Sequence, residues 1–191
     1  IPAGLSLIRL PLTVTLVDEQ PASLQMIGDL FDTLGANNVS LLITYSKSNQ
    51  AWVSYWGDAS RGDRSDRVIT PDLGIIAHMK QNISLNLLGE PWLAQDTAEI
   101  RLNRGLNLIG LPLEDPRIKQ AGDLFLLPEL TDSLNAIIVV SENRFKILVR
   151  DGESSDVLLT GAEALVVMAK NDIVFNLQGR GWLTDKNHNV D

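Results

Sequence analysis

A block of alternating apolar residues occurs twice in the chain, at an offset of 101 positions (105 − 4). Residues 4–12 read Gly-Leu-Ser-Leu-Ile-Arg-Leu-Pro-Leu, and residues 105–113 share seven of these nine positions. Alternation of apolar and polar residues predicts a β-strand with one buried face. The phase slips by one residue between Leu7 and Ile8, which predicts either a β-bulge or burial on both faces.

Two further blocks recur in the same order, so the repetition extends over most of the chain. Residues 28–31, Gly-Asp-Leu-Phe, are identical to residues 122–125, and residues 80–93 match residues 170–183 at seven of fourteen positions. Three blocks in one order indicate a tandem duplication. The predicted segments are two pseudo-repeats and a polar tail, at residues 1–94, 95–184 and 185–191.

Each pseudo-repeat has the pattern of a strand, a helix and then four strands. In the first repeat the helix begins after Pro21, because the apolar residues that follow fall at helical spacing, and Gly35 can end it. Pro128 shortens the corresponding helix of the second repeat. The other predicted strands are residues 39–45, 50–56, 74–79 and 83–88 in the first repeat, and residues 136–140, 145–150, 164–169 and 173–177 in the second.

Strands outnumber helices, and most connections between them are short enough for hairpins. The predicted fold is therefore α+β and mainly antiparallel β, with each repeat a small sheet or partly open barrel that carries one helix. We also expect residues 99–102 to form a strand that enters the second repeat. The short linker at residues 94–98 predicts contact between the repeats and leaves open whether they exchange a strand.

Composition limits the kinds of partner and chemistry. Of the 191 residues, 45% are hydrophobic and the net charge is −8, a globular composition that disfavours nucleic acid and anionic membranes as partners. No apolar run approaches the roughly 18 residues of a membrane-spanning helix. The absence of cysteine excludes disulfides, thiol catalysis and Cys-ligated metal sites. Because the sequence starts at Ile1 without Met, we expect a segment of a longer protein or a mature product.

Comparison of the two repeats assigns a place to three of the tryptophans. At an offset of 95 positions (147 − 52), Trp52 corresponds to Ile147, so this position is apolar in both repeats. We therefore expect Trp52 in the core. Trp92 and Trp182 follow a glycine-containing turn at the end of each repeat, and we expect each of them to cover the bottom of its core.

The same comparison indicates a candidate binding site. Tyr55 corresponds to Arg150 and Trp56 to Asp151, so both aromatic residues occupy positions that are polar in the second repeat. We expect Tyr55 and Trp56 to be exposed, with Asp58 nearby as a hydrogen-bonding group. Exposed aromatic rings of this kind can stack on a sugar ring. The alternative is that they pack against the second repeat or against a neighbouring domain.

The polar tail contains a candidate calcium site. Asp185, Asn187, Asn189 and Asp191 place oxygen-bearing side chains at alternate positions, which is the spacing of the first ligands of an EF-hand-like loop. The segment resembles the start of a dockerin or thrombospondin type 3 calcium repeat. Val190 stands where such loops need glycine, so we expect weak calcium binding at most, and no other cofactor. The alternative is a polar tail that binds no metal.

Catalytic residues are hard to place in this sequence. The two histidines, His78 and His188, accompany no Ser-His-Asp set, phosphate-binding glycine loop or dinucleotide-binding motif. We therefore expect a protein that is not an enzyme. The tripeptide Arg61-Gly62-Asp63 is one that integrin receptors read, but three residues carry little information and a solvated charged loop is the favoured explanation.

The Gly-x-Asn-Leu-Ile-x-Leu-Pro-Leu block, followed later in each repeat by Gly-x-x-Trp, resembles a tandem module of large secreted bacterial surface proteins. There the module accompanies immunoglobulin-like, adhesive and dockerin-like domains. The first repeat departs from the pattern at Ser6 and Arg9. The resemblance implies a secreted or cell-surface location and an accessory role, with no catalytic residues to carry over.

These observations lead to one functional expectation and two alternatives. We expect a non-catalytic accessory module pair of an exported multidomain protein, serving display, spacing or adhesion. Its partners would be neighbouring domains of the parent protein, and a glycan or another surface protein. The alternatives are a carbohydrate-binding module and an enzyme domain of an unrecognised type.

Overall fold

The computed structural model describes residues 1–47, 49, 51–56, 67–92, 96–141, 144–150 and 157–182. Most of the described residues lie in antiparallel strands, and the sheets are open rather than closed into a barrel. The predicted α+β, mainly antiparallel β fold is therefore confirmed. No described helix is long and apolar enough to cross a membrane.

The first half of the described chain, residues 1–92, contains a four-stranded sheet, a three-stranded sheet and one helix. The four-stranded sheet has the order β1-β6-β4-β5, and the three-stranded sheet has the order β3-β2-β7. The elements are β1 (Gly4–Ile8), β2 (Leu12–Val17), β3 (Gln20–Pro21), α1 (Ile27–Leu34), β4 (Val39–Ser46), β5 (Ala51–Trp56), β6 (Ile75–Met79) and β7 (Leu87–Pro91).

The second half, residues 96–182, repeats the four-stranded sheet but not the three-stranded one. Its four-stranded sheet has the order β12-β11-β13-β9, and two-stranded sheets pair β10 with β15 and β14 with β8. The elements are β8 (Thr97–Leu102), β9 (Gly105–Gly110), β10 (Leu113–Glu114), the 3-10 helix η2 (Ala121–Leu126), β11 (Leu134–Ser141), β12 (Arg144–Leu148), β13 (Ala164–Ala169), β14 (Ile173–Gln178) and β15 (Arg180–Gly181). The strand predicted at residues 99–102 lies within β8, so this prediction is confirmed.

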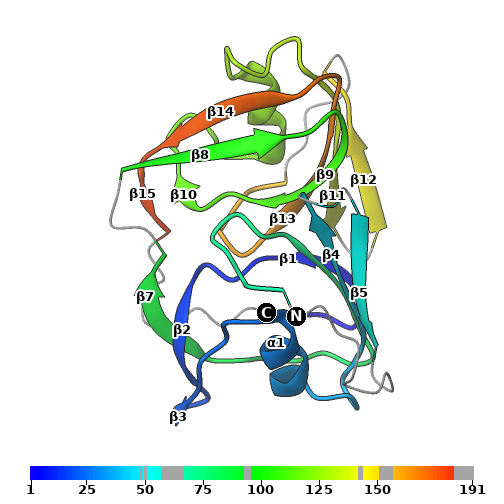
Figure 1. Cartoon of the computed structure of the whole chain (residues 1–191), viewed down its shortest axis with the longest axis vertical. Coiled ribbons are helices and arrows are strands. Elements are labelled where there is room, and N and C mark those ends of the chain that lie inside the picture. The colour runs from blue at the N-terminus through cyan, green and yellow to red at the C-terminus, as the bar shows by residue number, and fades with distance from the viewer. Residues whose placement is uncertain are drawn as a thin grey trace.

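The two four-stranded sheets have the same order once β9, β13, β11 and β12 are matched with β1, β6, β4 and β5. The pairing registers also agree, because Ser6 faces Ala77 in the first half and Asn107 faces Val167 in the second. Figure 1 shows the two halves one above the other, with the four-stranded sheets where they meet. The expected common strand order is therefore confirmed for the four-stranded sheets, whereas the smaller sheets differ.

The phase slip in the repeated block marks burial on both faces, and the β1–β6 register contains no bulge. Leu7 and Leu108 belong to a cluster between the two halves, whereas Ile109 belongs to the core of the second half. The prediction that the repeated block at residues 4–12 forms a single strand is nevertheless wrong. The chain leaves the four-stranded sheet after Ile8 and enters another sheet at Leu12.

The helix is shorter than predicted in both halves. In the first half it begins at Ile27, where the Asp29 carboxylate accepts the backbone N–H of Met26 at 2.8 Å and so caps the first turn. Asp123 accepts the N–H of Gln120 at 3.0 Å in the same way, but Pro128 follows closely and only a 3-10 helix forms.

Each half has its own apolar core, and a third cluster joins the two. The first core lies between the helix and the sheets of the first half, and Trp92 packs against it. Trp92 and Trp182 donate their indole N–H groups to the carbonyls of Leu10 and Leu111, at 2.8 and 2.7 Å. Both tryptophans are half-buried, and the contact of Trp92 with the first core agrees with its expected role as a cover.

Reciprocal backbone contacts hold the halves together. Arg9 N–H donates to the carbonyl of Ala162 at 2.7 Å, and Gly110 N–H donates to the carbonyl of Asp72 at 2.9 Å. Arg9 and Gly110 occupy equivalent positions of the repeated block. The same contact is therefore made twice, once in each direction, so the four-stranded sheets meet with approximate twofold symmetry.

We predict that Leu108→Ala lowers the free energy of unfolding by about 2–5 kcal/mol, the usual cost of a cavity at a buried leucine. Leu108 is 2% exposed, whereas Leu106 on the same strand is 43% exposed. The control Leu106→Ala should therefore cost under about 1 kcal/mol. Urea unfolding followed by tryptophan fluorescence measures both losses, and equal losses would contradict the assigned burial.

Candidate interaction surface

The first four-stranded sheet is apolar on the side that faces away from its own core. The register of β4 and β5 places Trp52 opposite Tyr45, and Trp56 opposite Leu41. Residues directly opposite each other in an antiparallel pair project to the same side. Tyr45 is buried between the two halves, but Trp52 and Trp56 are 44% and 56% exposed because β5 is the outermost strand.

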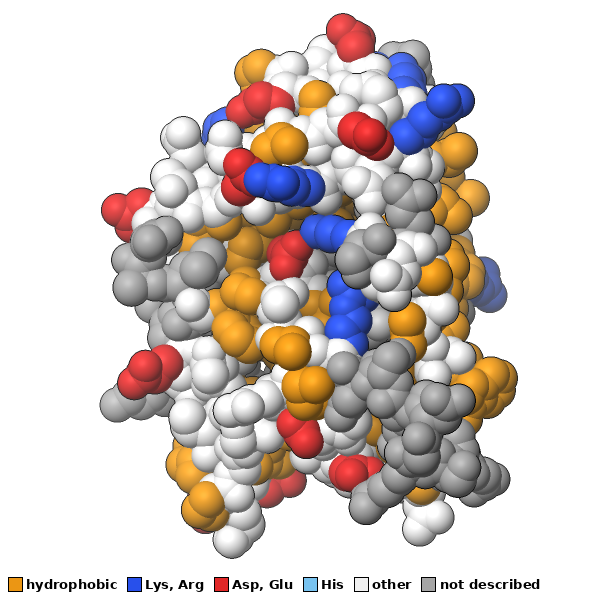
Figure 2. Space-filling view, viewed as in Figure 1, with side chains coloured by type: hydrophobic (Ala, Val, Ile, Leu, Met, Phe, Trp, Pro, Cys, Tyr) orange, Lys and Arg blue, Asp and Glu red, His pale blue; other side chains and the backbone are white. Residues whose placement is uncertain are grey.

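The second sheet has a matching exposed region on its outermost strand, β12. Phe145 and Ile147 are 57% and 63% exposed, and they project to the side on which Val140 and Ile138 pack against the first half. We call Trp52 and Trp56 the first apolar edge, and Phe145 and Ile147 the second apolar edge. In Figure 2, hydrophobic side chains gather along the side of the molecule where Figure 1 places β5 and β12.

Two contacts position the tryptophans of the first apolar edge. The ring of Trp52 lies 5.2 Å from the ring of Tyr45, centroid to centroid, and the two planes are tilted by 58°. The indole N–H of Trp56 donates to the hydroxyl of Ser54 at 3.1 Å. Ser54 lies between the two tryptophans on the same side of the strand. The edge therefore presents two broad apolar rings with one small polar group between them.

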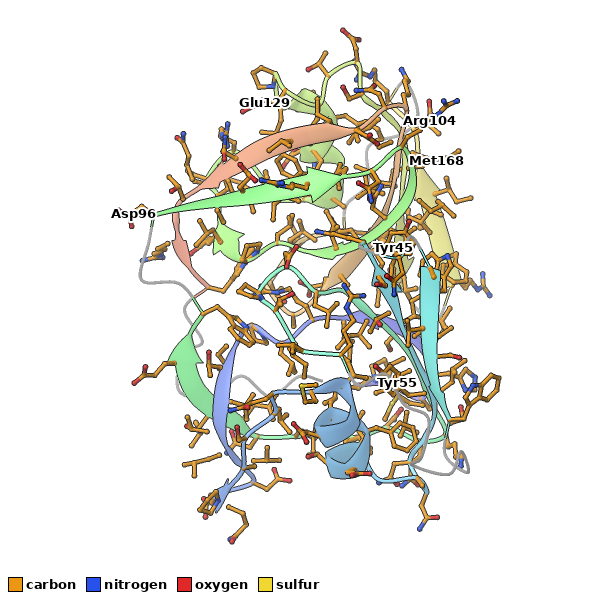
Figure 3. All side chains as sticks on the ribbon, viewed as in Figure 1. Tyr45, Tyr55, Asp96, Arg104, Glu129 and Met168 are labelled. Atoms are coloured by element: carbon orange, nitrogen blue, oxygen red, sulfur yellow. The ribbon has the colours of Figure 1, made fainter. Side chains whose placement is uncertain are left out.

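Two predictions about this strand are wrong. Tyr55 is 1% exposed and belongs to the core of the first half, as Figure 3 shows by its position near α1. Trp52, expected in the core, is exposed, and so is its expected counterpart Ile147. The predicted exposure of Trp56 is confirmed.

The error comes from the length of a hairpin. Four residues separate β4 from β5 (51 − 46 − 1), whereas two separate β11 from β12 (144 − 141 − 1). Equivalent residues of the two halves are therefore 95 positions apart before the hairpin and 93 positions apart after it (148 − 55). Tyr55 pairs with Leu42 as Leu148 pairs with Ile137, so its true counterpart is the buried Leu148.

Several predicted site residues lie outside the described residues. They are Asp58, the tripeptide Arg61-Gly62-Asp63, and the candidate calcium ligands Asp185, Asn187, Asn189 and Asp191. The exposed aromatic pair thus consists of Trp52 and Trp56, and Tyr55 does not join it. Within the described ranges, no group of three or more His, Asp or Glu residues is arranged to hold a metal ion.

Sequence reasoning missed a buried arginine at the junction of the halves. Arg9 is 2% exposed and donates from Nη1 to the carbonyls of Leu111 and Gly161, at 2.8 and 2.7 Å. Burial lowers the pKa of Arg9 to about 10, although the negative charges of Glu163 and Asp72 act in the opposite direction. The guanidinium therefore stays charged at neutral pH. The sequence feature that could have indicated this burial is that Arg9 is the one charged residue in the apolar block at residues 4–12.

The carboxylates near Arg9 are already engaged. Asp72 forms an ion pair with Lys47 at 2.6 Å and accepts the hydroxyl of Thr70 at 2.9 Å. Burial acts to raise the pKa of Asp72, but the charge and hydrogen bond of Lys47 hold it below its ordinary value. Glu163 accepts two backbone N–H groups, at 2.7 and 3.1 Å. This arrangement is typical of a structural charge network rather than of a proton-transfer pair.

A second buried carboxylate ties the end of the second half to its first strands. Asp115 accepts two hydrogen bonds from the Arg117 guanidinium, at 2.9 and 2.7 Å, and one from Gln178 N–H at 2.8 Å. Burial acts to raise the pKa of Asp115, but these hydrogen bonds hold it below its ordinary value. A neighbouring groove of about 460 Å³ is lined by Asp96, Glu114, Pro116, Gly179 and Arg180.

We predict that Tyr55→Ala lowers the free energy of unfolding by about 3–5 kcal/mol, as expected for a core aromatic residue. Trp56→Ala should cost under about 1 kcal/mol because the side chain is exposed. Urea unfolding followed by far-ultraviolet circular dichroism compares the two without relying on the altered fluorophore. A loss at Trp56 as large as that at Tyr55 would show that Trp56 is buried.

We also predict that Asp115 contributes to the acid sensitivity of the protein. Its pKa is lower in the folded than in the unfolded chain, so its contribution is present above pH ~4 and disappears as the pH falls below that value. The stability difference between the unaltered protein and Asp115→Asn should be largest at neutral pH and smaller in acid. Urea unfolding at several pH values measures it, and a difference that grows in acid would refute the assignment.

Comparison with known proteins identifies no relative of this chain. No family model, no curated protein and no solved structure matches the chain. The resemblance to modules of secreted surface proteins therefore rests on the two short motifs alone.

Proposed function

We propose that this chain is a non-catalytic accessory module pair of an exported multidomain protein, and that it contacts a partner through its two apolar edges. The observation that carries the proposal is the exposure of Trp52, Trp56, Phe145 and Ile147 on the outermost strands of both sheets. Exposed apolar residues gathered in this way are typical of protein interaction sites. The proposed roles are adhesion, display or spacing.

The chemistry of the edges suits a protein partner. Tryptophan is enriched among the residues that contribute most to binding, because one ring covers a large apolar area with few rotatable bonds. No described strand pairs with the outer edges of β5 and β12, so their backbone groups are available to a partner strand. The proposed partners are a neighbouring domain of the parent protein or another surface protein.

The proposed location is extracytoplasmic, either secreted or at the cell surface. This part of the proposal is supported by the motif resemblance alone. The net charge of −8 disfavours nucleic acid as a partner. Neither apolar edge needs a cofactor for this role.

Carbohydrate binding is the second candidate, and a specific feature of the first apolar edge favours it. Trp52 and Trp56 are four residues apart on one side of a strand, so their rings are separated by roughly 13 Å along it. The hydroxyl of Ser54 lies between them and is already bonded to Trp56. Such a surface suits an extended glycan, whose apolar ring faces stack on the indoles while its hydroxyls meet Ser54.

We predict that the double variant Trp52→Ala with Trp56→Ala weakens partner binding at least tenfold, because both rings would lie at the centre of the contact. Surface plasmon resonance against neighbouring domains of the parent protein tests the leading function. A glycan array tests the alternative. Loss of glycan binding in the double variant would favour a carbohydrate-binding module.

The control is Leu126→Ala, which removes an exposed apolar side chain of η2 rather than one on either edge. Its binding should equal that of the unaltered protein. If the double variant binds as well as the unaltered protein, the first apolar edge is not the contact surface.

A further inference from the structure

The strand β8 of the second half has no counterpart among the described residues of the first half. In the second half, β14 pairs with β8 along six residues, from Ile173 with Leu102 to Gln178 with Thr97. In the first half, the segment that matches β14 is residues 83–88, which were predicted to be a strand. That prediction is wrong for residues 83–86, and the strand β7 begins only at Leu87.

Matching hydrogen bonds show that residues 83–88 occupy the place of β14. Ala3 N–H donates to the side chain of Asn82 at 2.7 Å, and Arg104 N–H donates to that of Asp172 at the same distance. The two donors are 101 positions apart (104 − 3) and the two acceptors are 90 positions apart (172 − 82). These are the offsets of the repeated blocks, so the two hydrogen bonds are equivalent. The turn before this segment is therefore built alike in both halves.

In the first half, Ile1 forms the one described pair of the pairing that β8 and β14 form in the second half. Ile83 N–H donates to the carbonyl of Ile1 at 2.9 Å, and the amino group of Ile1 donates to the carbonyl of Ile83. This pair corresponds to Leu102 and Ile173 in the second half, where β8 continues the ladder (1 + 101 = 102; 83 + 90 = 173). No described residue continues it in the first half.

Backbone groups of residues 83–88 point towards the position that β8 holds in the second half, which no described residue of the first half beyond Ile1 occupies. Asn86 exchanges hydrogen bonds with Asp18 on the β2 side, at 2.9 Å in both directions. Because backbone groups alternate in direction along an extended segment, those of Leu85 and Leu87 project to the other side, as those of Ile83 do. An edge that no described strand pairs with is a ready acceptor for another strand.

The apolar cores of the two halves differ where β8 packs in the second half. In the second half, Ile100 of β8 is 0% exposed and packs in a core with Phe175 and Leu177, which are also fully buried. The side chains that correspond to Phe175 and Leu177 are Leu85 and Leu87, and both are only partly buried. Among the described residues, none supplies to the core of the first half the side chain that Ile100 supplies to the second.

We propose that the open edge formed by Ile83, Leu85 and Leu87 is an acceptor for a β-strand. The occupant is an extended polypeptide segment from outside these 191 residues, which pairs antiparallel with the edge and ends its pairing beside Ile1. By analogy with β8, it carries a branched apolar residue opposite Leu85 and a small residue opposite Leu87, with polar residues between them. This strand acceptor is separate from the apolar edges and does not depend on their proposed role.

The sequence of β8 provides the peptide segment with which the proposal can be tested. Figure 3 shows β8 running between the labelled residues Asp96 and Arg104. The full chain is prepared with the hexapeptide Asp-Thr-Ala-Glu-Ile-Arg, the sequence of residues 96–101, joined to the amino group of Ile1. This junction reproduces the one between Arg101 and Leu102 in the second half. Tethering gives the segment a high effective concentration at the edge.

We predict that amide hydrogen exchange at Leu85 and Leu87 slows at least tenfold in the extended chain, because a paired amide exchanges only after local opening. The matched control is the same extension with aspartate in place of its isoleucine, which cannot enter the core and should give no protection. Exchange at Phe175 and Leu177 in the second half provides an internal reference.

Two results would overturn the proposal. One is unchanged exchange at Leu85 and Leu87 in a chain whose circular dichroism shows it to be folded. The other is concentration-dependent protection of these amides in the chain without the extension, with a dimer in light scattering. That result would make a second copy of this chain the occupant.

Discussion

The packing of one four-stranded sheet against the other is the interaction on which the rest of the structure depends. Each sheet is apolar on both sides, with its own core on one side and the shared cluster of Leu7, Tyr45 and Leu108 on the other. A single small sheet could not keep its second apolar side from water. Association of the two sheets is therefore part of how each half becomes stable.

The buried Arg9 shows how the approximate symmetry of this contact is broken. Arg9 and Gly110 are equivalent in sequence and lie against each other, so there is room for a side chain on only one of them. A Cβ atom added to Gly110 would lie 2.7 Å from Cδ of Arg9. Burying the guanidinium is costly, because Nε and Nη2 have no hydrogen-bond partner among the described residues. The charges of Asp72 and Glu163 offset part of this cost.

The exposed apolar edges follow from the same geometry. The shared cluster covers Tyr45 and Val140, but it does not extend to the neighbouring strands β5 and β12. Trp52 and Phe145 therefore continue an apolar surface beyond the place where the sheets cover each other. The edges are the uncovered margins of the surface that joins the halves, which is why they occur in both halves despite their different residues.

The sequence by itself determined the repeated block and the mainly antiparallel fold, because apolar periodicity and turn residues act locally. It predicted that the two halves share a strand order, but the order itself came from the tertiary structure. Trp56 is exposed as expected, but the expectation rested on Asp151 as its counterpart, and the shifted alignment places Val149 there instead. Only the tertiary structure decided that Tyr55 is buried and Trp52 is not. A hairpin two residues shorter in the second half shifts the alignment without changing which face is buried. Likewise, nothing in residues 83–88 indicates that the strand they predict lacks a partner, because strand pairing depends on segments distant in sequence.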